Sequence, residues 1–140
     1  MRRYLAVDDS DVALLFLAES LTRLGGQCDV ARDGEEAVAR FLAALDQNRP
    51  YDAVFLDIMM PRMDGLEAAR RIKDIQDERC PQPRAKVLII SCLHDPVPMV
   101  ESHFECGADI YLPKPLDEDV LAEALINLEL LEAPVNLDID

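Results

Sequence analysis

The chain has 140 residues, half of them hydrophobic, which suits a single domain with a substantial core. Its 28 acidic and 14 basic residues give a net charge of −14, which argues against direct binding to nucleic acid, because such binding needs basic groups to replace phosphate counterions. The acidity suits contact with a basic protein surface, or serves solubility alone. No stretch has the form of a signal peptide or the length of a membrane span, and the four cysteines lack metal-site spacing. We therefore expect a cytoplasmic protein with reduced thiols and no membrane contact.

Short apolar runs alternate with helical patterns along the first half of the chain. The elements expected here are a strand over 4–7, a helix from Ser10 or Asp11 to about Leu24, a strand over 28–31, a helix from Asp33 through Leu45, and a strand over 53–56. The first helix has an apolar stripe that includes Val12 and Phe16. The strand over 53–56 is apolar throughout, which is typical of a strand buried on both faces, and Asp57 follows where the apolar run stops.

The same alternation continues through the second half. The elements expected there are a helix over 66–75, a polar loop over 76–85 interrupted by two prolines, a strand over 87–90, a helix over about 99–106, a strand over 110–112, and a helix capped by Asp117 that runs to about Leu131. Strand followed by helix, five times, predicts an α/β fold with right-handed crossovers and a parallel sheet covered on both faces. We expect one domain over residues 1–132 and a short tail over 133–140.

Polar residues recur where the predicted strands end. They are Asp8 and Asp9 after the first strand, Asp57 at the end of the third, Ser91 after the fourth and Lys114 after the fifth. In a parallel sheet these ends share one edge, where ligands bind. Crowded carboxylates repel one another, and a hard divalent cation such as Mg²⁺ relieves the repulsion. Lysine and serine would suit phosphoryl oxygens, and an aspartate can act as a nucleophile that forms an aspartyl phosphate.

These residues stand within a larger set of motifs that covers nearly the whole chain. The motifs are Asp8-Asp9-Ser10, Asp33-Gly34-Glu35-Glu36-Ala37, Asp57 with Pro61 and Gly65, Ser91, Gly107-Ala108-Asp109, and Tyr111-Leu112-Pro113-Lys114-Pro115. As a set they resemble the receiver domain of two-component response regulators. The resemblance implies a doubly wound, flavodoxin-like (β/α)5 fold with strand order 2-1-3-4-5.

The resemblance also implies a role for each site residue. Asp57 would be the phosphoacceptor, and Ser91 and Lys114 would contact the phosphoryl group. The metal ion, Mg²⁺ or Mn²⁺, would be bound directly by Asp9 and Asp57, through water by Asp8, and by the backbone carbonyl of Met59. Tyr111 would be the switch aromatic, and the Lys114–Pro115 peptide bond would be cis.

The sequence departs from the family pattern in a few places. The 76–85 segment is longer than the usual connection, and its role is open between a partner contact and a slack loop. The hydroxyl is Ser91 rather than the commoner threonine, and Cys92 stands where the family prefers a small residue. Met59 and Leu93, which would flank the acceptor, are both apolar.

The function that the resemblance implies is a phospho-acceptor switch rather than an enzyme, since it would catalyse only its own phosphorylation and dephosphorylation. A histidine kinase or a histidine phosphotransfer protein would donate the phosphoryl group, and an output protein would respond. Few residues follow Leu131, so we expect either a stand-alone receiver or a fragment of a larger regulator or hybrid kinase. A Mg²⁺-dependent phosphatase with an aspartate nucleophile is a weaker alternative, because its D-x-D pair on the first strand is missing. A second alternative is a pseudo-receiver, a module of the same fold that serves only for protein interaction. Such a module would usually lack one of the acidic residues or the lysine, and this chain has all of them.

Overall fold

The computed structural model describes residues 1–60, 63–91 and 107–132. Its five strands are β1 (Arg3–Val7), β2 (Gln27–Ala31), β3 (Ala53–Asp57), β4 (Lys86–Ser91) and β5 (Ile110–Pro113). They form one parallel sheet in the order β2-β1-β3-β4-β5, which confirms the α/β fold and the strand order expected by resemblance. The helix expected over 99–106 and the tail over 133–140 lie outside the described residues.

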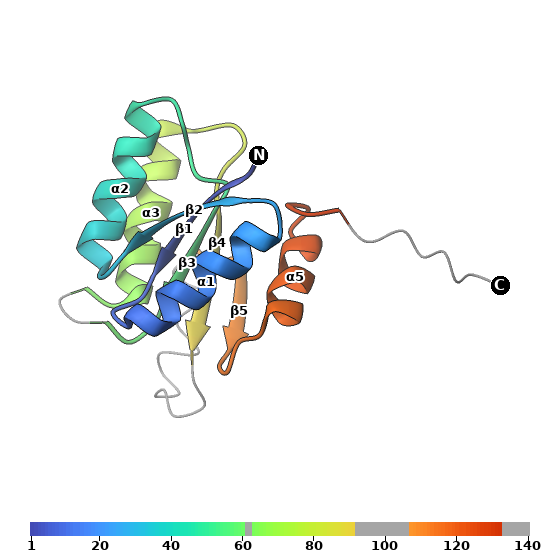
Figure 1. The fold of residues 1–140 in the computed structure, drawn as a ribbon. Coiled ribbons are helices and arrows are strands. Elements are labelled where there is room, and N and C mark those ends of the chain that lie inside the picture. The colour runs from blue at the N-terminus through green and yellow to red at the C-terminus, as the bar shows by residue number, and fades with distance from the viewer. Residues whose placement is uncertain (61–62, 92–106, 133–140) are drawn as a thin grey trace.

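Within the described residues, two pairs of helices cover the two faces of the sheet (Figure 1). The helices are α1 (Asp11–Arg23), α2 (Gly34–Asp46), α3 (Gly65–Arg79) and α5 (Glu118–Asn127). Successive strand residues point to opposite faces, so Val54 and Leu56 of β3 pack with α2 and α3, whereas Ala53 and Phe55 pack with α1 and α5. All of β3 is buried, as its apolar composition predicted. None of the described helices is both long enough and apolar enough to span a bilayer.

Each described helix begins at a side-chain cap that the sequence supplies. Ser10 Oγ accepts a hydrogen bond from the backbone N–H of Ala13, and Asp33, Asp64 and Asp117 accept equivalent bonds at the starts of α2, α3 and α5. The sequence predicted either Ser10 or Asp11 as the cap of the first helix, and the structure shows that it is Ser10. These caps fix where the loops after β1, β2, β3 and β5 end, and the loops after β1, β3 and β5 carry site residues.

The helix α3 is longer than the sequence predicted. Residues 76–79, expected to be loop because they are polar, continue the helix to Arg79. The reason is that Gln76 turns inward: its Oε1 accepts from the N–H of Ala85 at 2.6 Å, and its Nε2 donates to the carbonyl of Ala85 at 3.3 Å. A buried amide thus substitutes for an apolar residue and ties the end of α3 to the start of β4. The connection itself contains a cis Gln82–Pro83 bond.

The helix α5 is shorter than predicted, and the stripe of α1 differs from the prediction. The chain leaves α5 after Asn127 through Glu129, which has a φ of 62°, and the N–H of Leu130 then bonds the carbonyl of Leu125. The apolar pattern runs on to Leu131 because Leu128, Leu130 and Leu131 pack against the core after the helix has ended.

In α1, Val12 lies outside the buried stripe, with 79% of its surface exposed.

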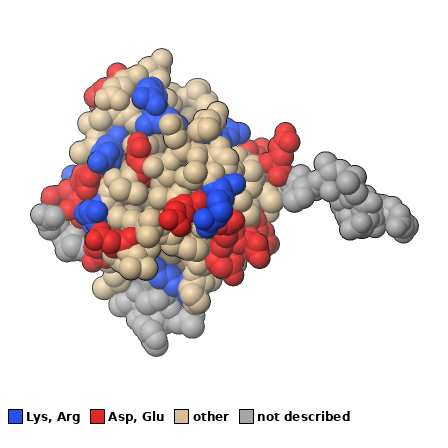
Figure 2. Space-filling model, in the orientation of Figure 1, with Lys and Arg blue, Asp and Glu red and all other residues tan. Residues whose placement is uncertain are grey.

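The negative charge is uneven over the surface. Figure 2 shows acidic side chains crowded over α5, and no lysine or arginine occurs among residues 117–132. A protein that bound this face would have to present basic or neutral groups.

Candidate functional site

Three carboxylates meet at the carboxyl edge of the sheet. Val7 of β1 lies opposite Leu56 of β3, so the next residues along the two strands, Asp8 and Asp57, come side by side. Carboxylate oxygens of Asp8, Asp9 and Asp57 all lie within 4.8 Å of one another. Asp8 and Asp57 are buried, with 2% and 6% of their surfaces exposed, whereas Asp9 is exposed. The strand ends therefore assemble the acidic cluster that the sequence predicted.

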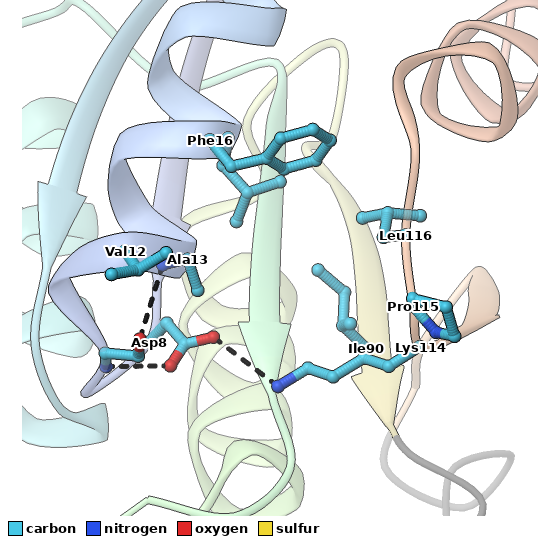
Figure 3. Close-up of a pocket in the computed structure, with 10 residues that line it drawn as sticks. Asp8, Val12, Ala13, Phe16, Ile90, Lys114, Pro115 and Leu116 are labelled. Atoms are coloured by element: carbon cyan, nitrogen blue, oxygen red, sulfur yellow. Dashed lines mark hydrogen bonds and ion pairs between the residues drawn. The ribbon is translucent and has the colours of Figure 1, made fainter.

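Lys114 directly follows the edge strand β5 and reaches this cluster past the end of β4, which lies between β3 and β5. Its Nζ lies 3.0 Å from Oδ1 of Asp57 and 3.7 Å from Oδ2 of Asp8. The backbone N–H of Lys114 donates to the carbonyl of Ser91 at 2.6 Å, which extends the β4–β5 pairing past the end of the strand. The Lys114–Pro115 bond is cis, as expected. Figure 3 shows the lysine side chain extended toward Asp8.

Burial shapes the electrostatics of the two inner carboxylates. It raises the pKa of Asp57 to about 6, and Asp8 and Asp9 push the pKa in the same direction while Lys114 opposes them. Burial also raises the pKa of Asp8, against the N–H of Ser10, which donates to Oδ1 of Asp8 at 2.9 Å. Both carboxylates are thus costly to ionise when only protein groups surround them.

The donor set fits a hard divalent cation. Three carboxylates and one ammonium group leave two negative charges uncompensated at neutral pH, and carboxylate oxygens are the ligands that Mg²⁺ prefers. Asp8, Asp9 and Asp57 would hold the ion. The backbone carbonyl of Met59 remains a predicted ligand; the Met59 side chain is 54% exposed, just beyond the cluster.

Ser91 and Tyr111 form a second feature of the same edge. Ser91 is buried at the end of β4, and Tyr111 is half-buried on β5 opposite Ile89. The hydroxyl oxygens of Ser91 and Tyr111 are within hydrogen-bond contact. The two residues predicted to sense the phosphoryl group are thus already linked. Cys92 and Leu93, which the sequence analysis noted for their differences from the family pattern, lie outside the described residues.

Gly65 was identified only as a motif glycine, but it has a direct structural role beside Asp57. Its N–H donates to the carbonyl of Ile58 at 2.9 Å, and a Cβ at this position would lie 2.2 Å from the Asp57 carbonyl oxygen. The start of α3 is therefore pressed against the acceptor strand, and only glycine fits there without movement. The sequence placed Gly65 in the loop before the predicted helix, whereas the structure makes it the first residue of α3, where alanine would be the better helix former.

Comparisons with known proteins identify the family and the fold of this chain. The family model described as the response regulator receiver domain matches residues 4–126. The response regulator MprA of Mycobacterium sp. (strain KMS) is 39% identical over 121 residues, which are 86% of this chain and 47% of that protein. The CheY chain in a CheX–CheY–BeF3–Mg²⁺ complex from Borrelia burgdorferi is 30% identical with a TM-score of 0.78, covering 91% of this chain and 89% of that one. The response regulator TrrA of Thermotoga maritima, solved with Mg²⁺–BeF, is 31% identical with a TM-score of 0.74, covering 91% and 99%.

The chain belongs to the family of response regulator receiver domains, which act in two-component signalling. It spans about half the length of the MprA proteins that it matches.

Proposed function

We propose that this receiver is a phospho-acceptor switch in which Asp57 takes a phosphoryl group from a histidine kinase or a histidine phosphotransfer protein in the cytoplasm. One observation carries the proposal: the buried Asp57, which ends β3, lies 3.0 Å from the Lys114 ammonium within a cluster of three carboxylates. An acceptor carboxylate needs a rigid position and nearby positive charge, and the strand end and the lysine supply these.

The residues around Asp57 have separate tasks in this proposal. With a pKa of about 6, Asp57 is mainly ionised at neutral pH, so its oxygen can attack phosphorus while the donor imidazole keeps the electron pair of the broken P–N bond. Lys114 stabilises negative charge on the phosphoryl oxygens, and Ser91 donates its hydroxyl to one of them. Mg²⁺ or Mn²⁺, bound by Asp8, Asp9, Asp57 and the Met59 carbonyl, would supply further charge neutralisation.

The contact between Ser91 and Tyr111 suggests how phosphorylation changes partner affinity. Either hydroxyl can donate in this contact, and once Ser91 gives its one proton to a phosphoryl oxygen only Tyr111 can donate, so phosphorylation fixes the direction of this hydrogen bond. Tyr111 lies on the edge strand β5, and its ring packs with the core cluster on the α2–α3 face of the sheet, so a shift of the ring would change the surface on that side of β5. Because α5 is acidic, we expect an output partner with basic or neutral groups rather than a nucleic acid.

The proposal is tested by incubating the chain with acetyl phosphate and measuring its intact mass. We expect one phosphoryl group per chain, and none when Mg²⁺ is removed by a chelator. The same preparation should not turn over simple phosphate esters, which separates a switch from an aspartate-nucleophile phosphatase. Sustained multiple turnover of an ester would favour the phosphatase, and labelling without a divalent cation would contradict the metal assignment.

Replacing Lys114 is expected to uncouple phosphorylation from the conformational response. Lys114→Ala removes the ammonium that lies 3.0 Å from Asp57 but no metal ligand, so Mg²⁺ affinity should change by less than about tenfold. The phosphorylation-dependent shift of the Tyr111 environment, followed by NMR, should be lost. Lys73→Ala, which removes a lysine from the surface of α3, is the matched control and should respond as the wild type does. A Lys114→Ala protein that still switched fully would refute this role.

A further inference from the structure

The first residue of α2 contacts the loop that follows the acceptor strand. Gly34 begins α2 and belongs to the Asp33-Gly34-Glu35-Glu36-Ala37 motif, which the proposed function leaves without a task. A Cβ at this position would lie 2.6 Å from the carbonyl oxygen of Met63 and 2.8 Å from the Met63 Cβ. Since α2 and α3 lie side by side on one face of the sheet (Figure 1), the loop that leads into α3 runs against the start of α2. Only glycine allows so close an approach without movement.

The start of α2 is held in place by its own hydrogen bonds and by the core. Asp33 Oδ1 accepts a hydrogen bond from the N–H of Glu36 at 2.8 Å, and Glu36 Oε1 accepts one from the N–H of Arg32 at 3.0 Å. Further along the same helix, Phe41 is buried in the core. A side chain added at Gly34 would therefore displace the loop.

The other side of this contact is a loop whose two ends are fixed. The N–H of Ile58 donates to the carbonyl of Ile90 at 3.0 Å, and the N–H of Gly65 donates to the carbonyl of Ile58 at 2.9 Å, which closes the loop. Met63, between these ends, is buried in the core. Met59, whose carbonyl is the predicted metal ligand, belongs to the same closed loop. Because the ends cannot follow a displacement of Met63, the part of the loop that carries Met59 must adjust.

We infer that Gly34 is a positioning residue for the metal site, because it permits the approach of α2 to Met63 on which the placement of the Met59 carbonyl depends. The inference rests on the proposed function, of which Mg²⁺ at the carboxylate cluster is a part. Gly34 acts through Met63 and does not itself bind the metal or the phosphoryl group. Loss of a residue that orients a metal ligand typically weakens metal binding about 10- to 100-fold.

The test measures the Mg²⁺ affinity of Gly34→Ala by isothermal titration calorimetry, at a temperature where denaturation curves show each variant to be folded. We expect the dissociation constant for Mg²⁺ to rise about tenfold, because the three carboxylate ligands remain and only the carbonyl is misplaced. The Mg²⁺ concentration that gives half of the maximal labelling rate with acetyl phosphate should rise in the same proportion. The rate at saturating Mg²⁺ should change by less than about twofold, whereas a general loss of structure would lower it.

Gly26→Ala is the matched control. A Cβ at Gly26 would lie 2.3 Å from the ring of Tyr4, so this variant also crowds the core, but it does so just before β2, at the opposite edge of the sheet from the carboxylate cluster. We expect Gly26→Ala to be less stable than the wild type and to bind Mg²⁺ with unchanged affinity.

Met63→Ala tests the same contact from the side of the loop. It removes the buried side chain that anchors the loop and leaves Gly34 in place, and we expect a loss of Mg²⁺ affinity of similar size. Unchanged Mg²⁺ affinity in Gly34→Ala, or in Met63→Ala should the first variant not fold, would overturn the inference. An equal loss of affinity in Gly26→Ala would also overturn it. A wild type that binds no Mg²⁺ would refute the proposed function itself, so the two failures are distinct.

Discussion

Gly65→Ala is expected to lower the free energy of unfolding by about 3 kcal/mol and to slow phosphorylation of Asp57 roughly 10- to 100-fold. The added Cβ would lie 2.2 Å from the Asp57 carbonyl oxygen and 2.9 Å from its carbonyl carbon, so α3 or the end of β3 must move. Either movement displaces the acceptor carboxylate from Lys114. Helix propensity alone predicts the opposite sign, because alanine is a better helix former than glycine. Urea denaturation and the rate of labelling by acetyl phosphate would measure the two effects.

Gly25→Ala is a suitable control for that experiment. Gly25 has a φ of 90°, which disfavours alanine, but a Cβ there meets no atom within 4 Å. We expect a loss of about 1 kcal/mol from the strained backbone and no change in the phosphorylation rate. If Gly65→Ala were as stable as the wild type and equally fast, the close approach of α3 to Asp57 would have no functional consequence.

Asp57→Asn is expected to stabilise the metal-free protein by about 1 to 3 kcal/mol at pH 7.5. Burial raises the pKa of Asp57 from 3.8 to about 6, so ionising this group costs more in the folded state than in the unfolded chain. The cost is fully present only well above pH 6, where both states are ionised, and disappears as the pH falls below the unfolded-state pKa of 3.8, where both become protonated. The stability difference between variant and wild type should therefore shrink over that interval.

Added Mg²⁺ should act in the opposite direction. It stabilises the wild type by binding the folded state, whereas the variant has lost one carboxylate ligand and gains less. Asp52→Asn serves as the control, because Asp52 stands just before β3 and accepts a hydrogen bond from the N–H of Arg3, which asparagine preserves, and the variant loses only a partly exposed ion pair with Arg2 at 3.5 Å. Thermal unfolding with and without Mg²⁺ at pH 4 and pH 7.5 would provide all of these comparisons. A destabilised Asp57→Asn protein at pH 7.5 without metal would contradict the electrostatic account.

The sheet and most of the site follow from local sequence patterns. The apolar run over 53–56 is typical of a fully buried strand, and a polar residue directly after such a strand falls on the ligand-binding edge of a parallel sheet. Predicting that Asp8 and Asp57 lie close together did not require the residue pairing between β1 and β3. The two strands end at the same edge of the sheet, so the two residues meet in any topology in which these strands are neighbours. Ser91 and Lys114 were located by the same reasoning, and the family resemblance supplied their order across the sheet.

Other features depend on contacts between distant parts of the chain, which no local pattern reports. Because Gln76 is polar, the sequence pattern predicted that the helix ends before it. In the structure Gln76 is buried and its side chain binds the backbone of Ala85. Leu130 continues the apolar period of α5 but reaches the core from a turn. A cavity beside Lys114 combines Val12 and Phe16 from α1 with Leu116, which is 100 residues further along the chain.

The central claim is that Asp57 is the one residue that accepts the phosphoryl group. The most direct test is the intact mass of the wild type, Asp57→Asn and Asp52→Asn after incubation with acetyl phosphate and Mg²⁺. Asparagine keeps the shape of the side chain but removes the nucleophilic carboxylate, while the Asp52 variant loses a carboxylate just before the start of the same strand. We predict one added phosphoryl group on the wild type and on Asp52→Asn, and none on Asp57→Asn. Labelling of Asp57→Asn at the wild-type rate would contradict the assignment.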